Sequence, residues 1–268
     1  MRQLSLREVQ LEELNLLVYF DQFCKENDLK YSLVYGTLIV AARHKGFIPW
    51  DDDIDVAMPR PDYEKLLALH KSFNKGEIEL IADKLNHSLD ATYAAVINHN
   101  IPCENTYSTT KRSQYLWIDI FPVDGFSEDT NKMELIYKKS RSLQKIVTLA
   151  SARLWKGKTF LHALGKLMIV PVCRLYGIQR CLNKMNQLAQ TFSYESSRYV
   201  GVIAWGEGTK ERLLKSEFEK MTTIEFEGKQ FSVMSCWREY LKNMYTDYTK
   251  LPPVEMRTGH NIVAHKEK

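Results

Sequence analysis

The sequence is short of the features that organise secreted and membrane-spanning proteins. Its 268 residues contain five cysteines, an odd number, and no C-x-x-C pair, which disfavours a disulfide framework or a thiolate zinc site. The N-terminus has no apolar stretch typical of a signal peptide, and the most apolar run, 167–172, is too short to span a bilayer. We therefore expect a cytoplasmic protein, either free or peripheral at the inner face of the membrane.

Acidic residues are almost missing from one segment. Between Asn131 and Gln190 there are twelve Lys or Arg residues and a single acid, Glu134. This segment carries a formal charge of +11, and because the whole chain carries +4 the remainder must carry −7. Such segregation predicts an anionic partner for the basic segment, and an anionic membrane surface is one candidate. No recognition motif supports binding to nucleic acid.

The remaining composition is that of an ordinary globular protein, with 44% apolar and 26% charged residues. The chain is long enough for one large domain or for a core with a helical addition. The pattern of apolar residues predicts helices at 6–27 and 237–245, a helix that opens at Pro61, and a helical segment over 131–190 broken near Gly157 and Pro171. It predicts strands at 31–35, 53–58, 78–81, 93–97, 115–121 and 199–203, and a hairpin formed by 224–226 and 230–233. The strand at 115–121 is expected to end at Pro122 and a turn at Asp124–Gly125.

Two carboxylates are expected to share one strand face. Asp53 and Asp55 are two residues apart in the predicted strand 53–58, where Ile54 and Val56 alternate with them. Neighbouring carboxylates repel one another unless a cation neutralises them. Mg²⁺, which prefers hard oxygen ligands, is the natural solution, with Mn²⁺ as a substitute.

A third acid stands in a second predicted strand where apolar residues would be expected. Asp119 shares a strand face with Trp117 and Phe121. A carboxylate in that position is most easily explained as a metal ligand or as a paired group. Two aspartates from one strand, a third from its neighbour and the upstream Gly36 are the combination that polymerase-like sites need.

The acidic run has three other interpretations. A solvated loop is disfavoured by the apolar residues Ile54 and Val56. A calcium-binding EF-hand loop would need glycine where Val56 stands, and Pro59 and Pro61 would interrupt it. A D-x-D glycosyltransferase site stays open, although the upstream glycine and the later Asp119 argue against it.

Three motifs extend over most of the chain. They are Tyr35–Leu38 with Arg43–Asp55, then Trp117–Gly125, and finally Tyr240–Leu241, Tyr245, Asp247–Tyr248 and Leu251–Pro253. Together they resemble the motifs of the LicD family of bacterial phosphorylcholine transferases, which are similar to the fukutin-related proteins, and the first motif is the most specific.

The resemblance implies an α/β (α+β) fold with a nucleotidyltransferase-like mixed-sheet core. The expected organisation is a core with the metal site at 1–126, a basic helical insertion at 127–192 and a C-terminal part, 193–268, that completes the core. The resemblance also implies a magnesium site at Asp53, Asp55 and Asp119, with Asp51 close by.

The implied reaction is the transfer of phosphocholine from CDP-choline, or of the corresponding group from a related CDP-alcohol, to a sugar hydroxyl. The acceptor would be a lipid-linked precursor of teichoic acid or lipopolysaccharide, and CMP would be released. Asp119 and Asp51 are the candidate bases for the acceptor hydroxyl. A true nucleotidyltransferase that releases pyrophosphate is the main alternative, and a non-enzymatic metal-binding module is disfavoured.

Several further residues are predicted to bind substrate. Tyr35 belongs to the first motif, and the Gly36–Thr37 turn is expected to face the phosphates. Arg43 and Lys45, between this turn and the acids, are well placed to clamp a diphosphate. The resemblance suggests a role in the site for two C-terminal residues, Arg257 and His260.

Overall fold

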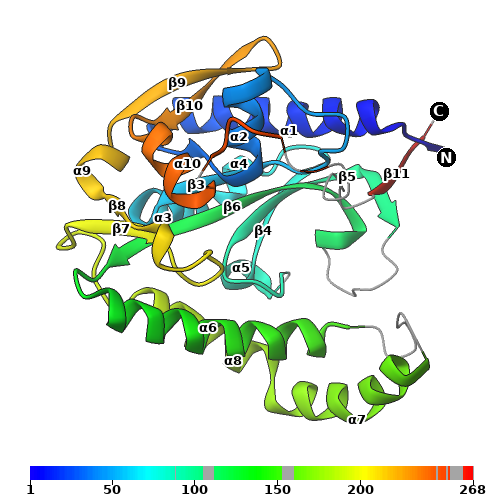
Figure 1. The fold of residues 1–268 in the computed structure, drawn as a ribbon. Helices are drawn as coiled ribbons and strands as arrows, with labels where there is room; N and C mark the ends of the chain where they lie inside the picture. The colour runs from blue at the N-terminus through cyan, green and yellow to red at the C-terminus, as the bar shows by residue number, and fades with distance from the viewer. Residues whose placement is uncertain are drawn as a thin grey trace.

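The computed structural model describes residues 1–87, 89–104, 112–152, 160–245, 247–251, 253 and 262–267. Helices and strands alternate irregularly along the chain, as in an α+β protein (Figure 1). The helices are α1 (Leu6–Glu26), α2 (Tyr35–His44), α3 (Arg60–Ala68), α4 (His70–Phe73), α5 (Asp83–Asn86), α6 (Thr130–Ala150), α7 (Phe160–Tyr176), α8 (Ile178–Ala189), α9 (Lys215–Phe218) and α10 (Trp237–Tyr245). The strands are β1 (Arg2–Gln3), β2 (Ser32–Leu33), β3 (Asp55–Pro59), β4 (Ile78–Ala82), β5 (Ala94–Glu104), β6 (Tyr115–Phe126), β7 (Tyr199–Val202), β8 (Leu213–Leu214), β9 (Met221–Phe226), β10 (Lys229–Met234) and β11 (Val263–Lys266).

A mixed sheet forms the centre of the protein. Its main path runs β1-β11-β5-β6-β3-β2, with β4 added to β5, β7 added to β6, and β8 added to β7. The pair β3–β6 is parallel, whereas β5–β6, β6–β7 and β2–β3 are antiparallel. The hairpin β9–β10 forms a separate two-stranded sheet. The mixed sheet and its helices confirm the predicted α+β class.

Helix α1 forms as the apolar pattern predicts. Ser5 caps it in a capping box with Glu8, because each side chain bonds to the other residue's backbone N–H. Its apolar face, which includes Leu16 and Phe20, is buried in the main core. That core lies between α1 and the sheet and also receives α2, α3 and α10.

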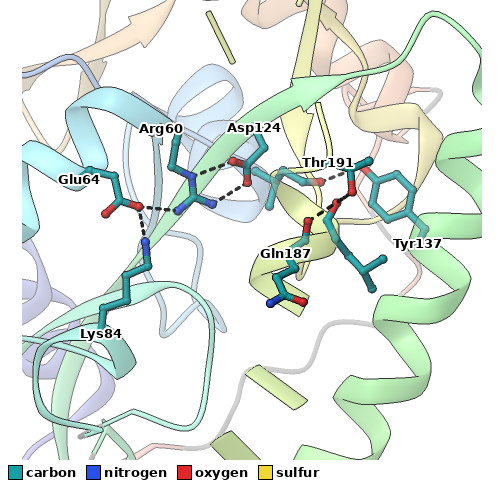
Figure 2. A network of polar contacts seen from close by, with 9 residues as sticks. Arg60, Glu64, Lys84, Asp124, Tyr137, Gln187 and Thr191 are labelled. Carbon is teal, nitrogen blue, oxygen red and sulfur yellow. Dashed lines mark hydrogen bonds and ion pairs between the residues drawn. The ribbon is translucent and has the colours of Figure 1, made fainter. Parts of the chain in front are cut away.

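Strand β6 is longer than predicted, and the expected end at Pro122 and the Asp124–Gly125 turn is wrong. Pro122 pairs in register with Met58 of β3, and the strand continues to Phe126 beside β7. Asp124 is buried and does not lie in an exposed turn. The guanidinium of Arg60 donates two hydrogen bonds to its carboxylate, at 2.7 and 2.6 Å (Figure 2). A buried partner of opposite charge thus offsets the cost of placing an acid inside a strand.

The start of α2 also differs from the prediction. The strand expected at 31–35 is only β2, and the helix begins at Tyr35, so Gly36 and Thr37 lie in the first helical turn. The strand expected at 53–58 begins at Asp55, which leaves Asp53 in the loop before β3. The other predicted strands and the helix at 237–245 are confirmed to within a few residues, apart from the extension of β5 to Glu104 and longer arms in the β9–β10 hairpin. Strands β1, β8 and β11 were not predicted.

Helices α6, α7 and α8 lie together at the bottom of Figure 1, with strands of the sheet between them and α1. The predicted helical break at Pro171 is wrong, because that proline lies inside α7. The break occurs at Gly177, whose φ of +95° suits glycine and separates α7 from α8. The break expected at Gly157 lies outside the described residues. Helices α6 and α8 pack on Phe126, Ile203 and Ala204, and so join the sheet at β6 and β7.

Candidate active site

Two of the predicted acids meet on neighbouring strands. Asp55 of β3 and Asp119 of β6 are in register in a parallel pair, and the backbone N–H of Asp119 donates to the carbonyl of Ile54 at 2.9 Å. Residues in register on adjacent strands project from the same face of the sheet. The pKa of Asp55 is raised well above its usual range, chiefly by burial and then by the charges of Asp53 and Asp119. Asp53 and Asp119 therefore both act electrostatically on Asp55, but Asp53 precedes β3 and does not share its strand face with Asp55 as predicted.

The acids upstream of β3 lie in a loop that is fixed from two sides. The buried Gln10 of α1 donates to the carbonyls of Ile48, at 3.1 Å, and Asp51, at 2.8 Å. Asp52 is itself buried and accepts a hydrogen bond from the backbone N–H of Ile262 at 3.2 Å. Segments far apart in sequence thus hold the loop that carries Asp51 and Asp53 against the first strand of the site.

Arg112 is a site residue that the sequence analysis missed. It opens a short 3-10 turn, Arg112–Gln114, directly before β6, and its Nε donates to Oδ1 of Asp119 at 2.7 Å while its Nη2 donates to Oδ2. The guanidinium carbon lies 4.4 Å from the ring centroid of Trp117. Burial alone would lower the pKa of Arg112, but the charges of Asp119, Tyr93 and Asp55 and the hydrogen bond to Asp119 together outweigh it, and the pKa is raised. Asp119 is thus held as a paired carboxylate.

Glu13 is a further acid that was missed. It lies on α1, is fully buried, and neither of its carboxyl oxygens has a hydrogen-bond partner among the described residues. Its pKa is raised well above the usual range by burial and then by Asp53, which places it close to the acidic loop. A signal existed in the sequence, because Glu13 falls on the same helical face as Val9 and Leu16.

Tyr35 connects the site to a buried acid on another segment. Its hydroxyl donates to Oε1 of Glu211 at 2.8 Å, and the same oxygen accepts from the backbone N–H of Glu207 at 2.9 Å. Burial raises the pKa of Glu211 to about 7, although these hydrogen bonds act in the opposite direction. Burial and the charge of Glu211 also raise the pKa of Tyr35. Glu211 therefore titrates near neutral pH in contact with a tyrosine of the first motif.

Gly36 and Thr37 differ in what they face. A Cβ atom added to Gly36 would meet no protein atom within 4 Å, so its surface is open. Thr37 is buried, and its hydroxyl accepts a hydrogen bond from the backbone N–H of Asp55 at 2.9 Å. Thr37 thus positions Asp55 from inside the fold, whereas Gly36 leaves space at the N-terminus of α2.

Arg43 and Lys45 have partners at the other end of α2. Arg43 Nη1 donates to the carbonyl oxygens of Tyr248, at 3.2 Å, and Lys250, at 2.7 Å, and so holds the C-terminal segment. Lys45 forms an exposed ion pair with Glu225 of β9 at 2.9 Å. Their predicted role with a diphosphate stays a prediction, and Arg257 and His260 lie outside the described residues.

A cavity of about 400 Å³ opens at Asp55. Four aromatic side chains surround the acid. They come from α2, β6, the loop after β7 and the end of α10, and are Tyr35, Phe121, Trp205 and Tyr245. Glu207, Lys210 and Met244 complete the wall. Residues from four separate segments thus converge on one carboxylate, as expected of a substrate site.

Two negative findings apply to the described part of the chain. Within it, no three His, Cys, Asp or Glu side chains stand close enough together to hold a metal ion as they are placed. None of its helices combines the length and the apolar character needed to cross a membrane.

Comparison with known proteins assigns the class first. The profile of the LicD/FKTN/FKRP nucleotidyltransferase domain matches residues 28–148, a range that contains α2, β3 and β6 with their acids. The chain is also 32% identical over 270 residues to the lipopolysaccharide cholinephosphotransferase LicD of Haemophilus influenzae, covering 98% of each chain. The protein therefore belongs to the LicD family of transferases. Uncharacterised proteins of Rickettsia prowazekii and Rickettsia typhi are each 46% identical over 37 residues, which is 14% of this chain and 14% and 12% of theirs.

Proposed function

We propose that this protein transfers phosphocholine from CDP-choline to a sugar hydroxyl of a lipopolysaccharide or teichoic acid precursor, releasing CMP, with Mg²⁺ bound at the acids. The observation that carries the proposal is the cavity in which Asp55, in register with Asp119, is walled by aromatic side chains. The relationship to a lipopolysaccharide cholinephosphotransferase over the whole chain supports it.

The aromatic wall suits the choline end of the donor. A quaternary ammonium group cannot donate hydrogen bonds, and proteins bind it against the faces of aromatic rings. Tyr35, Trp205 and Tyr245 line the cavity beside Asp55, and Trp205 is the strongest partner type for a cation. In this arrangement the trimethylammonium group lies among the rings, and the phosphate to which it is linked reaches the acids.

The acids suit a divalent cation in their chemistry. Asp53, Asp55 and Asp119 offer hard oxygen ligands. The pKa of Asp55 is raised first by burial and then by repulsion from Asp53 and Asp119, and a cation would relieve that repulsion. As placed, Asp119 is paired with Arg112, so binding a metal through Asp119 requires that pair to open or shift. When bound, Mg²⁺ or Mn²⁺ would draw negative charge from the scissile phosphate.

Groups of the protein itself orient the donor phosphate and accept the proton of the acceptor hydroxyl. The open surface of Gly36 admits a phosphate to the N-terminus of α2, where free backbone N–H groups favour anions. Asp51 and Asp119 are the candidates for accepting the proton of the acceptor hydroxyl. The hydrogen bonds from Arg112 stabilise the charged form of Asp119.

Product analysis tests this function. The protein is incubated with Mg²⁺, a glycan acceptor and a panel of CDP-choline, other CDP-alcohols and nucleoside triphosphates, and the products are separated. We expect CMP from CDP-choline and a phosphocholine-bearing acceptor. Release of pyrophosphate from a triphosphate, without CMP from any CDP-alcohol, would instead identify a true nucleotidyltransferase.

We also place the reaction at an anionic lipid surface on the cytoplasmic side of the membrane. Helix α7 exposes a ridge of apolar side chains, with Met168 76%, Val172 66% and Leu175 90% exposed. The positions recur every three to four residues and so lie on one helical face. Arg180 and Lys184 lie next to the ridge, within 5.0 and 5.6 Å of the ring of Tyr176. An apolar ridge beside basic residues matches the chemistry of an anionic membrane surface, where a lipid-linked acceptor would be found.

A further inference from the structure

A second cavity, of about 690 Å³, lies directly beside the one at Asp55. It is formed by one face of α6 and by the segment 207–210. Glu207 and Lys210 line both cavities and therefore stand on their common boundary. A ligand in the second cavity can reach the acids past these two side chains.

Hydrogen bonds fix α6, which forms one wall of this cavity, to the end of β7 and the loop after it. From α6, Tyr137 donates to the carbonyl of Val202 at 2.8 Å, and Ser140 and Gln144 both donate to the carbonyl of Ala204, at 2.6 and 2.7 Å. Tyr137 and Ser140 are buried. Because Trp205 and Glu207 lie one and three residues after Ala204, these bonds set the distance between α6 and the cavity at Asp55.

The cavity is predominantly basic. On α6, Lys138, Arg141 and Lys145 recur every three to four residues, so they stand above one another on one face. They are exposed, and none of them forms an ion pair with a described carboxylate. The guanidinium of Arg141 lies near the backbone of Gly208, because a Cβ added there would approach its Nη2 to 3.2 Å. Like charges on adjacent turns repel one another, and an anion between them would relieve that repulsion.

The acidic residues of the cavity leave this basic face uncompensated. Glu134 and Glu207 also line it, and Lys210 stands 3.5 Å from Glu207. Four basic side chains thus face two acids, and the three on α6 remain available to a ligand. A lysine or arginine array of this kind binds phosphate and carboxylate groups.

We propose that this cavity is the subsite for a phosphate- or carboxylate-bearing part of the glycan acceptor, and that it selects anionic acceptors. The proposal rests on the proposed phosphocholine transfer. The donor's phosphates belong at Asp55 and Gly36, whereas the acceptor must approach from beside them. The adjacent cavity provides that approach. The basic face of α6 then accounts for part of the charge asymmetry of the sequence.

The test is the double variant Lys138→Gln/Arg141→Gln, assayed in detergent with a water-soluble phosphorylated oligosaccharide. Losing two charge-assisted contacts should raise the KM for this acceptor at least about 10-fold. The KM for CDP-choline should not rise with it. After phosphatase treatment of the acceptor, wild type and variant should have similar acceptor KM values. The matched control Lys132→Gln/Lys139→Gln removes the same charge from α6 outside the cavity and should behave as wild type.

Two outcomes would overturn the assignment. A rise in the KM for CDP-choline, with an unchanged acceptor KM, would mean that the cavity holds the donor's diphosphate. An unchanged KM for both substrates would mean that the basic face is only solvated.

Direct binding separates this proposal from the proposed function. Calorimetric titration of the phosphorylated oligosaccharide into the protein without donor should show binding that the double variant weakens. If that holds but no phosphocholine is transferred, the proposed function fails and the subsite stands. If transfer occurs with equal acceptor KM before and after phosphatase treatment, the subsite fails and the function stands.

Discussion

Asp119 accepts hydrogen bonds from Arg112 through both of its carboxylate oxygens. An acid expected to bind a metal ion is therefore paired with the positive charge of a guanidinium group. The two residues are seven positions apart, and the short turn before β6 brings them together. The pair also stacks on Trp117, which shares the strand face of Asp119. Arg112 therefore stabilises the acidic cluster in the absence of any other cation.

This pair predicts a stability difference that depends on magnesium. Arg112→Ala removes the two hydrogen bonds and the positive charge that Arg112 gives to the buried Asp119 beside Asp55, which should lower the free energy of unfolding by about 3 kcal/mol in EDTA. Mg²⁺ should recover part of this loss, because it can take over the neutralising role. Urea unfolding in the two buffers measures the effect. Arg7→Ala, which breaks an exposed pair with Glu227, is the control, and an equal loss with and without Mg²⁺ in Arg112→Ala would contradict the account.

The buried Glu211 predicts a pH dependence of stability. Folding raises its pKa from 4.5 to about 7, so over that window the folded protein keeps a proton that the unfolded chain has lost. Stability from this group is therefore complete below about pH 4.5 and falls as the pH rises through about 7, by about 3 kcal/mol in total. Glu211→Gln cannot titrate and should lack this fall, whereas the exposed Glu207→Gln should keep it. Parallel stability curves for wild type and Glu211→Gln, measured by urea unfolding from acidic to mildly alkaline pH, would show the assignment to be wrong.

The open surface of Gly36 allows a direct test of phosphate approach. A Cβ added at Gly36 meets no protein atom, and its φ is not in the left-handed region, so Gly36→Ala should fold with unchanged or slightly greater stability. If a phosphate approaches the backbone there, the methyl group should raise the KM for the donor about 10-fold or more. Gly165→Ala, in α7, also has open space and serves as the control. Unchanged donor KM in Gly36→Ala would remove this residue from the site.

The ridge on α7 predicts membrane binding that combines apolar and electrostatic contributions. Val172→Gln/Leu175→Gln should weaken co-sedimentation with phosphatidylglycerol-containing vesicles at least about 10-fold, since burying one such side chain contributes about 1.5–3 kcal/mol. High salt should weaken wild-type binding as well. Leu11→Gln, an exposed leucine on α1, should bind like wild type. Equal binding to phosphatidylcholine vesicles with and without phosphatidylglycerol at low salt would exclude an electrostatic contribution to membrane binding.

The sequence predicted the parts of the site that follow from local periodicity. The alternation around Asp55 and the polar residue in an apolar strand at Asp119 indicated one strand acid in each of two strands, and the structure pairs them in register. The same alternation wrongly placed Asp53 in the strand, because β3 begins only at Asp55. Glu13 obeys the same logic on a helix and could have been found from its position on the apolar stripe of α1.

The missed features depend on partners that are distant in sequence. Asp124 looked like a turn residue because nothing local indicates that Arg60 neutralises it inside β6. Glu211 enters the site only because the chain returns after α8 and places it under Tyr35. The missed strand β11 pairs with β1 at the opposite end of the chain. Such long-range pairings leave no periodic trace in either segment alone.

The most direct test of the central claim is the rate of phosphocholine transfer by wild type and Asp55→Asn. The substitution keeps the size of the side chain in the cavity and removes the charge that faces Asp119. With CDP-choline, Mg²⁺ and a glycan acceptor, wild type should release one CMP for each phosphocholine transferred. Asp55→Asn should be at least about 100-fold slower, with a thermal midpoint no lower than that of wild type. Near-normal transfer by Asp55→Asn would contradict the account.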